Sequence, residues 1–228
     1  MPVWAFSLIP LTALVLGAFA ATVRAPSTMV TSGVQHFAAG LVFAAAASEI
    51  LPDLKHQGAA IPVVIGGAVG VLVMLGVKKL GEGTKGPFGL VAITSVDILV
   101  DGLVLGTGFA AGAKQGLLLT IALTIEILFL GLSMALKLRQ AIASRARVVA
   151  ITAGAGLLLP LGIIAGQPVS MLPAAYLTGV FAFSLIALLY LVVEELLVEA
   201  HTEPESPLIT ALFFAGFLLL LVLEETVT

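Results

Sequence analysis

Long apolar runs alternate with short polar or Pro- and Gly-rich breaks along the whole chain. A helix needs about 20 predominantly apolar residues to cross the hydrocarbon core of a bilayer, and eight of the runs are about that long. We therefore predict eight transmembrane helices, spans 1–8, near residues 2–22, 30–52, 59–78, 88–112, 116–137, 148–166, 173–198 and 206–225. A signal peptide has basic residues before its apolar core. The first run has no Lys or Arg there, so we interpret it as a span.

The composition excludes a water-soluble globular protein. Of the 228 residues, 60% are apolar and 10% are charged, whereas soluble domains have about 45–50% apolar and about 25% charged residues. The mean hydropathy is +1.21. The net charge of −3 gives no indication of nucleic-acid binding, and a chain without cysteine has neither disulfides nor thiolate metal sites. The sequence therefore predicts an all-α integral membrane protein, with residues 1–228 forming a single polytopic domain.

The basic residues of the connections are distributed unequally between the two sides of the membrane. One side receives Arg24, Lys78, Lys79, Lys85, Lys137, Arg139, Arg145 and Arg147, and the other receives Lys55 and Lys114. Because cytosolic loops hold the excess of Lys and Arg, we predict that the side with eight basic residues is cytosolic. Both termini then lie outside the cytosol, in a multi-pass protein of the plasma or inner cell membrane.

Two short segments near the ends of spans 2 and 7 resemble each other. Glu49–Asp53, with the sequence EILPD and followed by His56, resembles Glu195–Glu199, with the sequence ELLVE and followed by His201. The two spans cross the membrane in opposite directions, so we predict the first cluster at the outer face and the second at the inner face. Inverted repeats of this kind are typical of secondary transporters. The alternative interpretation is acidic helix ends in contact with water.

Three acidic residues lie deep inside predicted spans, Asp97 and Asp101 in span 4 and Glu126 in span 5. A carboxylate at the bilayer centre costs about 2.5–3.5 kcal/mol on insertion scales, and such groups typically line ion pathways. Asp97 and Asp101 are four residues apart, which places them on one face of a helix. No Lys or Arg occupies the centre of a span, so these acids need a bound cation, protons or both. The alternative is protonated acids that are hydrogen-bonded between helices.

Further acidic and His residues flank these three acids at both faces. We predict that they form two ion vestibules, an outer one with Glu49 and Asp53 and an inner one with Glu194, Glu195, Glu199 and His201. Solvated helix ends are the alternative for each of them. His36, in the inner half of span 2, receives no role.

These residues resemble the ZIP (Zrt/Irt-like) family of divalent metal transporters. The resemblance covers essentially the whole chain, and it is most specific from His36 to Pro52 in span 2 and from Val192 to Leu197 in span 7. It implies a 3+2+3 arrangement with an inverted repeat, in which spans 2, 3, 6 and 7 form a bundle beside spans 1, 4, 5 and 8. It also implies a homodimer and alternating exposure of a metal site on spans 4 and 5.

The metal-site motifs match the family in part. The family motif His-Asn-x-Pro-Glu-Gly corresponds to Asp97–Gly102, so Asp97 replaces the His and Asp101 replaces the Glu. The next motif, His-Glu-x-Pro-Glu-Gly, corresponds to Glu126–Gly131, where Glu126 takes the His position and apolar residues replace both acids. The resemblance therefore implies one site with three oxygen ligands, which shifts preference from zinc toward harder cations such as Mn²⁺ or Mg²⁺.

The sequence predicts a non-enzymatic transporter of divalent cations of the Zn, Mn and Fe class, without a cofactor. Its expected partners are the cation, the lipid bilayer and a second copy of the chain. No P-loop is present, so the transport is secondary or facilitated. One alternative is a ZIP-like carrier that has lost metal binding and moves protons or another solute. The other is an intramembrane aspartyl hydrolase, although the two Asp residues of such an enzyme face each other from different helices.

Overall fold

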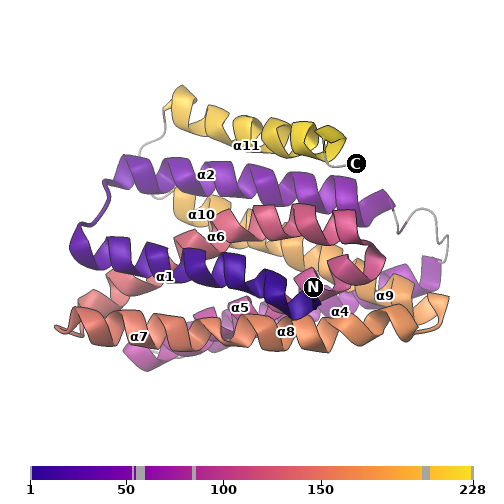
Figure 1. Cartoon of the computed structure of the whole chain (residues 1–228), viewed down its shortest axis with the longest axis horizontal. Helices are drawn as coiled ribbons and strands as arrows, with labels where there is room; N and C mark the ends of the chain where they lie inside the picture. Colours follow the sequence, from indigo (N-terminus) through magenta and orange to yellow (C-terminus); the bar gives the residue numbers. More distant parts are fainter. Residues whose placement is uncertain (1, 53, 55–59, 84–85, 202–205, 227–228) are drawn as a thin grey trace.

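The computed structural model describes residues 2–52, 54, 60–83, 86–201 and 206–226. Over these ranges the regular structure is helical and includes no strand. Eight helical segments in them are long and apolar enough to cross a membrane, which confirms the eight predicted spans (Figure 1). These segments are Val3–Val23, Thr28–Ile50, Ala60–Gly81, Gly89–Ala111, Ala113–Arg139, Arg145–Met171, Ala174–Ala200 and Pro207–Thr226.

Four of the spans are single α-helices: span 3 is α4 (Ala60–Gly83), span 4 is α5 (Pro87–Ala111), span 5 is α6 (Ala113–Arg139) and span 8 is α11 (Pro207–Thr226). Span 1 joins the 3-10 turn η1 (Val3–Ser7) to α1 (Leu8–Val23). Span 6 joins α7 (Arg145–Gly156), α8 (Leu158–Gly166) and the 3-10 turn η3 (Gln167–Met171). In span 2, α2 (Thr28–Ala45) continues into the π-helical segment η2 (Ala46–Ile50). In span 7, α9 (Ala174–Tyr190) continues into the π-helical segment η4 (Leu191–Leu196) and then α10 (Leu197–Ala200).

Local sequence signals determine where several helices begin. Ser27 precedes α2, and its side chain accepts a hydrogen bond from the Val30 N–H at 3.4 Å; Ser144 acts in the same way before α7. Such N-cap oxygens satisfy backbone N–H groups that have no partner in the first turn. Pro87 begins α5, where no N–H is needed, and Gly86 before it has a φ of 88°, a conformation that favours glycine.

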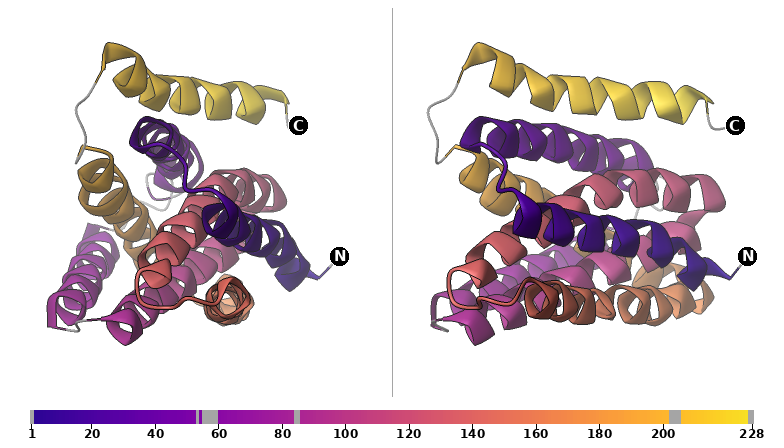
Figure 2. Two further views of the ribbon diagram at one scale, coloured as in Figure 1. Left: turned by 90° about the vertical axis from the view of Figure 1, so that its left-hand side faces the viewer. Right: turned by 60° about the vertical axis from the view of Figure 1, so that its left-hand side comes forward.

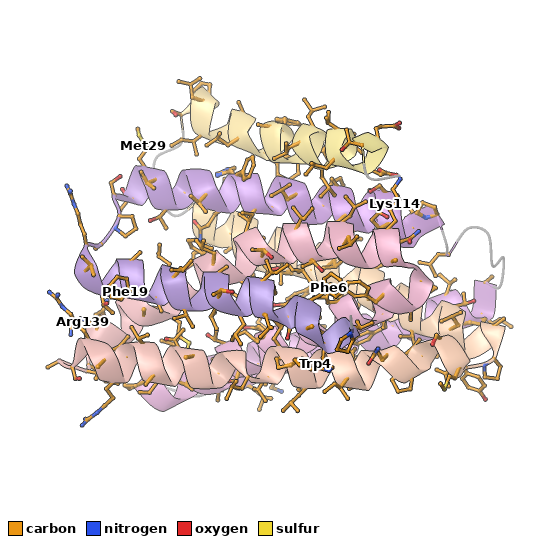
Figure 3. The ribbon with its side chains drawn as sticks, viewed as in Figure 1. Trp4, Phe6, Phe19, Met29, Lys114 and Arg139 are labelled. Atoms are coloured by element: carbon orange, nitrogen blue, oxygen red, sulfur yellow. The ribbon has the colours of Figure 1, made fainter. Side chains whose placement is uncertain are left out.

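The two ends of the bundle differ in charge. Figure 3 shows Arg139 at one end and Lys114 at the other. We call the end that contains Arg139 the basic end, because it contains most of the described basic residues: Arg24, Lys78, Lys79, Lys137, Arg139, Arg145 and Arg147. The orientation with this end in the cytosol stays a prediction.

The helix contacts of one half of the chain recur in the other half. α1 packs against α6 as α8 packs against α5, and α2 packs against α11 as α9 packs against α4. Each contact is converted into its counterpart when spans 1, 2 and 3 are exchanged with spans 6, 7 and 8, respectively, and span 4 is exchanged with span 5. Equivalent spans cross in opposite directions, so this contact pattern is that of an inverted repeat. The grouping of spans 2, 3, 6 and 7 beside spans 1, 4, 5 and 8, which the family resemblance implies, is wrong, because span 6 packs against span 4 and span 8 packs against span 2.

Glycines at equivalent positions allow close approach at two of these crossings. Gly131 of α6 lies against the Leu14 carbonyl of α1, and Gly102 of α5 lies against the Leu159 carbonyl of α8. A Cβ atom at either glycine would collide with that backbone. The glycines are 29 residues apart, and the two leucines are 145 residues apart. Small residues are what membrane-embedded helices use to pack closely.

The other two crossings are related in the same way. Gly216 of α11 lies against the Phe37 carbonyl of α2, and Gly70 of α4 lies against the Phe183 carbonyl of α9. The two glycines are 146 residues apart, and so are the two phenylalanines. This is also the separation between the segments 49–53 and 195–199. The repeat that the sequence predicts from those segments is therefore present in the helix packing.

The two outermost spans are also equivalent under the repeat. Within an 18-residue apolar stretch of each span, only 17% of the residues are buried in span 8 and 22% in span 3, against 67% in span 2 and 56% in span 5. Figure 2 shows α11 at the edge of the bundle, beyond α2. The interior therefore lies around α2, α5 and α6, and α4 and α11 expose apolar side chains.

Spans 2 and 7 each contain one π-helical segment, and the two segments occupy equivalent positions. η2 includes Glu49, and η4 includes Glu194 and Glu195. π-helical turns are rare and occur frequently at functional sites. These segments could not be predicted from the sequence, because one wider turn changes the hydrophobic period of a helix too little to be recognised. Their coincidence with acidic residues in both repeats points to a functional role for spans 2 and 7.

Candidate cation-binding site

A cavity of about 570 Å³ opens at the basic end, between α4, α5, α6 and the η4–α10 part of span 7. Its mouth is lined by two lysines and two glutamates whose side chains are between 40% and 54% exposed: Lys78, Lys137, Glu194 and Glu199. Asp97 lines the inner end of the cavity and is only 6% exposed. The cavity therefore connects the surface to the first of the acids inside the bundle.

Two further acids lie behind this cavity. Asp101 is 2% exposed on the same helix as Asp97, and Glu126 is 1% exposed on the neighbouring α6. Asp97 and Asp101 together line a crevice behind the cavity that is too narrow to admit a water molecule. These positions agree with the expectation that the three acids lie inside the bundle, and their role as ligands stays a prediction.

The buried carboxyl groups are not satisfied by the protein around them. Asp97 Oδ1, Asp101 Oδ2 and both Glu126 carboxyl oxygens have no hydrogen-bond partner among the described residues. A buried polar atom without a partner costs about 1–3 kcal/mol, and a charged one costs more. The charges that act most strongly on Asp101 and Glu126 are those of other carboxyls, including Asp97 and Glu195. The chemistry of this group of atoms therefore fits protons or a cation.

The acids do not form a closed coordination sphere in this conformation. Within the described ranges, no three His, Asp or Glu side chains are placed so that they could hold one metal ion. Binding of a single ion by Asp97, Asp101 and Glu126 together therefore requires their side chains, or α5 and α6, to move closer.

Two ion pairs join span 7 to its neighbours at the mouth of the cavity. Lys78 Nζ lies 2.7 Å from Glu194 Oε2, and Lys137 Nζ lies 3.2 Å from Glu199 Oε1. Ser133 Oγ also donates to Glu199 Oε1 at 3.3 Å. Glu194 and Glu199, which the sequence predicts in an inner ion vestibule, are therefore both paired with lysines, and the mouth combines acidic and basic groups. The role of the mouth as a vestibule stays a prediction.

Glu195 lies between the mouth and the buried acids. Its carboxyl interacts electrostatically with Asp97 in the interior and with Glu199 and Lys78 at the mouth. Its side chain is partly buried. A cation that enters from the basic end would therefore meet Glu195 before it reaches Asp97.

At the opposite end, residues equivalent to those of the cavity wall are tightly packed. The repeat relates Leu90 and Thr94, which line the cavity, to Leu119 and Leu123. Leu119 and Leu123 are both fully buried. The structure is thus open at the basic end and closed at the equivalent positions of the other end.

Glu49, which the sequence places in an outer vestibule, is enclosed in this conformation. Its side chain is 3% exposed, and its Oε1 accepts a hydrogen bond from Ser48 Oγ at 3.0 Å. Asp53 and His56, the other residues of the predicted outer cluster, lie outside the described residues.

His201 lies beside span 2 and does not line the cavity. Its ring centroid is 5.2 Å from that of His36. His36 is 1% exposed, whereas His201 is exposed. No role for His36 follows from the sequence, because only the packing of span 2 against the end of span 7 brings the two rings together.

No protein-family model matches this chain, and no curated protein matches its sequence. Its function is therefore inferred from the residues and the geometry of the cavity.

Proposed function

We propose that this protein is a secondary transporter of divalent metal cations, similar to the ZIP family, that binds its cargo at Asp97, Asp101 and Glu126. The observation that supports this most directly is the cavity that reaches Asp97 from the basic end, with unpartnered buried carboxyl oxygens behind it. Carboxyl groups that face a cavity at membrane depth are typical of ion pathways. The partial match to the ZIP metal-site motifs supports the same function.

The charge of the buried acids favours a cation as cargo. Two unit charges 4 Å apart interact by about 4 kcal/mol at an effective dielectric constant of about 20. Carboxylates that are close enough to interact therefore repel one another, and they also repel an anionic cargo. A divalent ion relieves this repulsion because it neutralises two carboxylates at once.

The ligand atoms favour harder cations. Asp97, Asp101 and Glu126 supply only oxygen, which suits Mg²⁺ and Mn²⁺, whereas Zn²⁺ is better served by nitrogen or sulfur ligands. Raw affinity still rises from Mn²⁺ toward Cu²⁺. We therefore propose a site at which Mn²⁺ or Fe²⁺ competes well with Zn²⁺.

The inverted repeat provides two routes to the same acids. The observed cavity reaches Asp97 from the basic end, with Glu195 beside the route. If the two repeats exchange conformations, an equivalent cavity opens at the opposite end and reaches Glu126, with Glu49 beside it. We propose that the protein alternates between these two conformations and so exposes the acids to one side at a time.

The proposal includes a cell membrane location with the basic end in the cytosol, and a homodimer. The orientation is supported by the excess of Lys and Arg at the basic end. The dimer is supported by the family resemblance, and α4 and α11 have the exposed apolar surface that a second copy or lipid would cover.

Uptake by proteoliposomes that contain the purified protein tests this function. We expect saturable Mn²⁺ uptake by the wild type, and loss of most of it in Asp101→Asn and in Glu126→Gln, because each variant removes a charged ligand. Glu225→Gln is the matched control, since Glu225 is an exposed acid at the end of α11. Undiminished Mn²⁺ uptake by the Asp101→Asn, Glu126→Gln double variant would contradict the proposal.

A carrier of protons alone is the second candidate function. One observation favours it, because the described acidic and imidazole groups do not converge on a metal position, and a proton needs only one carboxyl oxygen. A pH-sensitive dye inside the liposomes, with a chelator in all solutions, separates the two candidates. Proton flux without metal supports the second candidate, and metal uptake that depends on Asp101 supports the first.

A further inference from the structure

Ser32 holds the beginning of span 2 against the end of span 7. Its hydroxyl donates to the Ala200 carbonyl at 2.9 Å, and this hydrogen bond is buried. The next residue of span 7 is His201, and one helical turn after Ser32 on α2 is His36. The hydrogen bond therefore explains how two His residues from opposite parts of the chain are neighbours at the basic end.

The distance between the two rings fits a shared metal ion. The ring centroids of His36 and His201 are 5.2 Å apart, with an interplanar angle of 63°. With Zn–N bonds of about 2.1 Å and each nitrogen about 1.2 Å from its ring centre, two imidazoles on a tetrahedral zinc have centroids about 5.4 Å apart.

Backbone carbonyls hold both rings in the form that binds metals. His36 Nδ1 lies 2.9 Å from the Ser32 carbonyl oxygen, and His201 Nδ1 contacts the Leu197 carbonyl oxygen. A carbonyl oxygen only accepts hydrogen bonds, so Nδ1 is the protonated nitrogen and the lone pair of a neutral ring is on Nε2. Metal-binding His residues typically donate their second N–H to a carbonyl or carboxylate in this way.

The Nε2 atom of His36 lacks a partner. It is buried and has no hydrogen bond to any described residue, and the His36 side chain is 1% exposed. A buried acceptor without a partner is unfavourable. Coordination of a metal ion by His36 Nε2 removes this penalty.

A small polar cavity lies beside Ser32, the residue that links span 2 to span 7. Neither His36 nor His201 lines it. It has a volume of about 220 Å³, and its lining includes Ser32 and Gln35, which flank His36 on α2. It shares Ser133, Lys137 and Glu199 with the lining of the larger cavity. Ions at the basic end can therefore reach α2 next to the His pair through this cavity, and they can reach His201 from its exposed face.

We infer that His36 and His201 form a second metal site, separate from the buried carboxylates, that binds a divalent ion with a preference for nitrogen ligands, such as Zn²⁺ or Co²⁺. The two Nε2 atoms are the protein ligands, and water completes the coordination. This site goes beyond the proposed transport function, because it binds metal whether or not the carboxylates do.

The test uses the full chain, purified in detergent, with the Asp97→Asn, Asp101→Asn and Glu126→Gln substitutions combined so that the carboxylates no longer bind metal. In this background we expect calorimetry to show one Zn²⁺ per chain, and Co²⁺ to give the visible absorption of a site with nitrogen ligands. His36→Ala and His201→Ala should each abolish both signals. The chain has three His residues, so His56→Ala is the matched control and should retain them.

Two results would overturn the inference: Zn²⁺ binding that persists in His201→Ala, or a carboxylate variant that binds no Zn²⁺ at all. His201 is exposed, so its substitution is expected to leave the unfolding temperature unchanged, and it decides the question even where His36→Ala fails to fold. Failure of transport is a separate result. A wild type that does not take up metal, but loses bound Zn²⁺ with His201→Ala, refutes the proposed function and supports the second site.

Discussion

The close crossing of α1 and α6 predicts a large loss of stability in Gly131→Ala. The added methyl group would collide with the Leu14 carbonyl, and backbone atoms cannot rotate away as a side chain can. Overpacking of this kind costs about 1–3 kcal/mol. For a chain of this size, each 1 kcal/mol changes the midpoint of thermal unfolding by about 2–4 °C. We therefore expect the midpoint to fall by about 6–12 °C at the upper end of this cost.

Gly154→Ala is the matched control for this experiment. Gly154 is in the last turn of α7, and a methyl group there meets no atom within 4 Å. Replacement of a helical Gly by Ala favours the helix by up to about 1 kcal/mol, so this variant should unfold at or slightly above the wild-type temperature.

Thermal unfolding of the purified variants in one detergent measures both effects. The repeat adds a second requirement, because Gly102 makes the equivalent contact with the Leu159 carbonyl. Gly102→Ala should therefore lower the midpoint about as much as Gly131→Ala does. If Gly131→Ala unfolds at the temperature of Gly154→Ala, the reasoning about the close crossing is refuted, and if only one of the two glycines is sensitive, the equivalence of the crossings is refuted.

Lys78 competes with the cation for Glu194, and an exposed ion pair of this kind is worth about 0.2–1 kcal/mol. Lys78→Met should therefore lower the Mn²⁺ concentration for half-maximal uptake by up to about fivefold. An unchanged concentration would contradict this competition. Glu126→His should shift the metal preference toward Zn²⁺ when Zn²⁺ and Mn²⁺ compete for uptake. A variant with the metal preference of the wild type would exclude Glu126 as a ligand. Uptake should fall as the medium is acidified, because carboxylates must be deprotonated to coordinate, and uptake that rises would contradict this. Cysteines at Pro2 and Thr228 should react with an impermeant thiol reagent in intact cells, whereas labelling only after lysis would reverse the orientation.

The spans could be predicted from sequence because the thickness of a bilayer fixes the length of an apolar helix. The ends of a span are predicted less accurately, as span 6 illustrates. The apolar pattern predicts residues 148–166, but the helical segment extends from Arg145 to Met171. Arg145 and Gln167 belong to the helix although they are polar, because the ends of a span extend beyond the hydrocarbon core into the headgroup region.

The buried acids could also be predicted, because Asp97, Asp101 and Glu126 are charged residues within otherwise apolar helices. The ion pair between Lys78 and Glu194 could not, since its members are 116 residues apart and charges near the end of a span are ordinary. The contact between His36 and His201 is equally non-local. Such contacts depend on which spans pack together, and hydropathy gives no information about that.

The inverted repeat relates the backbones of the two ends of the bundle but not their charges. The positions equivalent to Lys78 and Lys137 at the opposite end are Glu224 and Gly108. A cation at the basic end therefore competes with two ammonium groups for the glutamates of the mouth, and the opposite end has no lysine at these two positions. The concentration gradient still sets the direction of net passive flux, because a difference between the mouths cannot change an equilibrium. Weaker retention of the cation at the basic end instead makes release there faster than release at the other end.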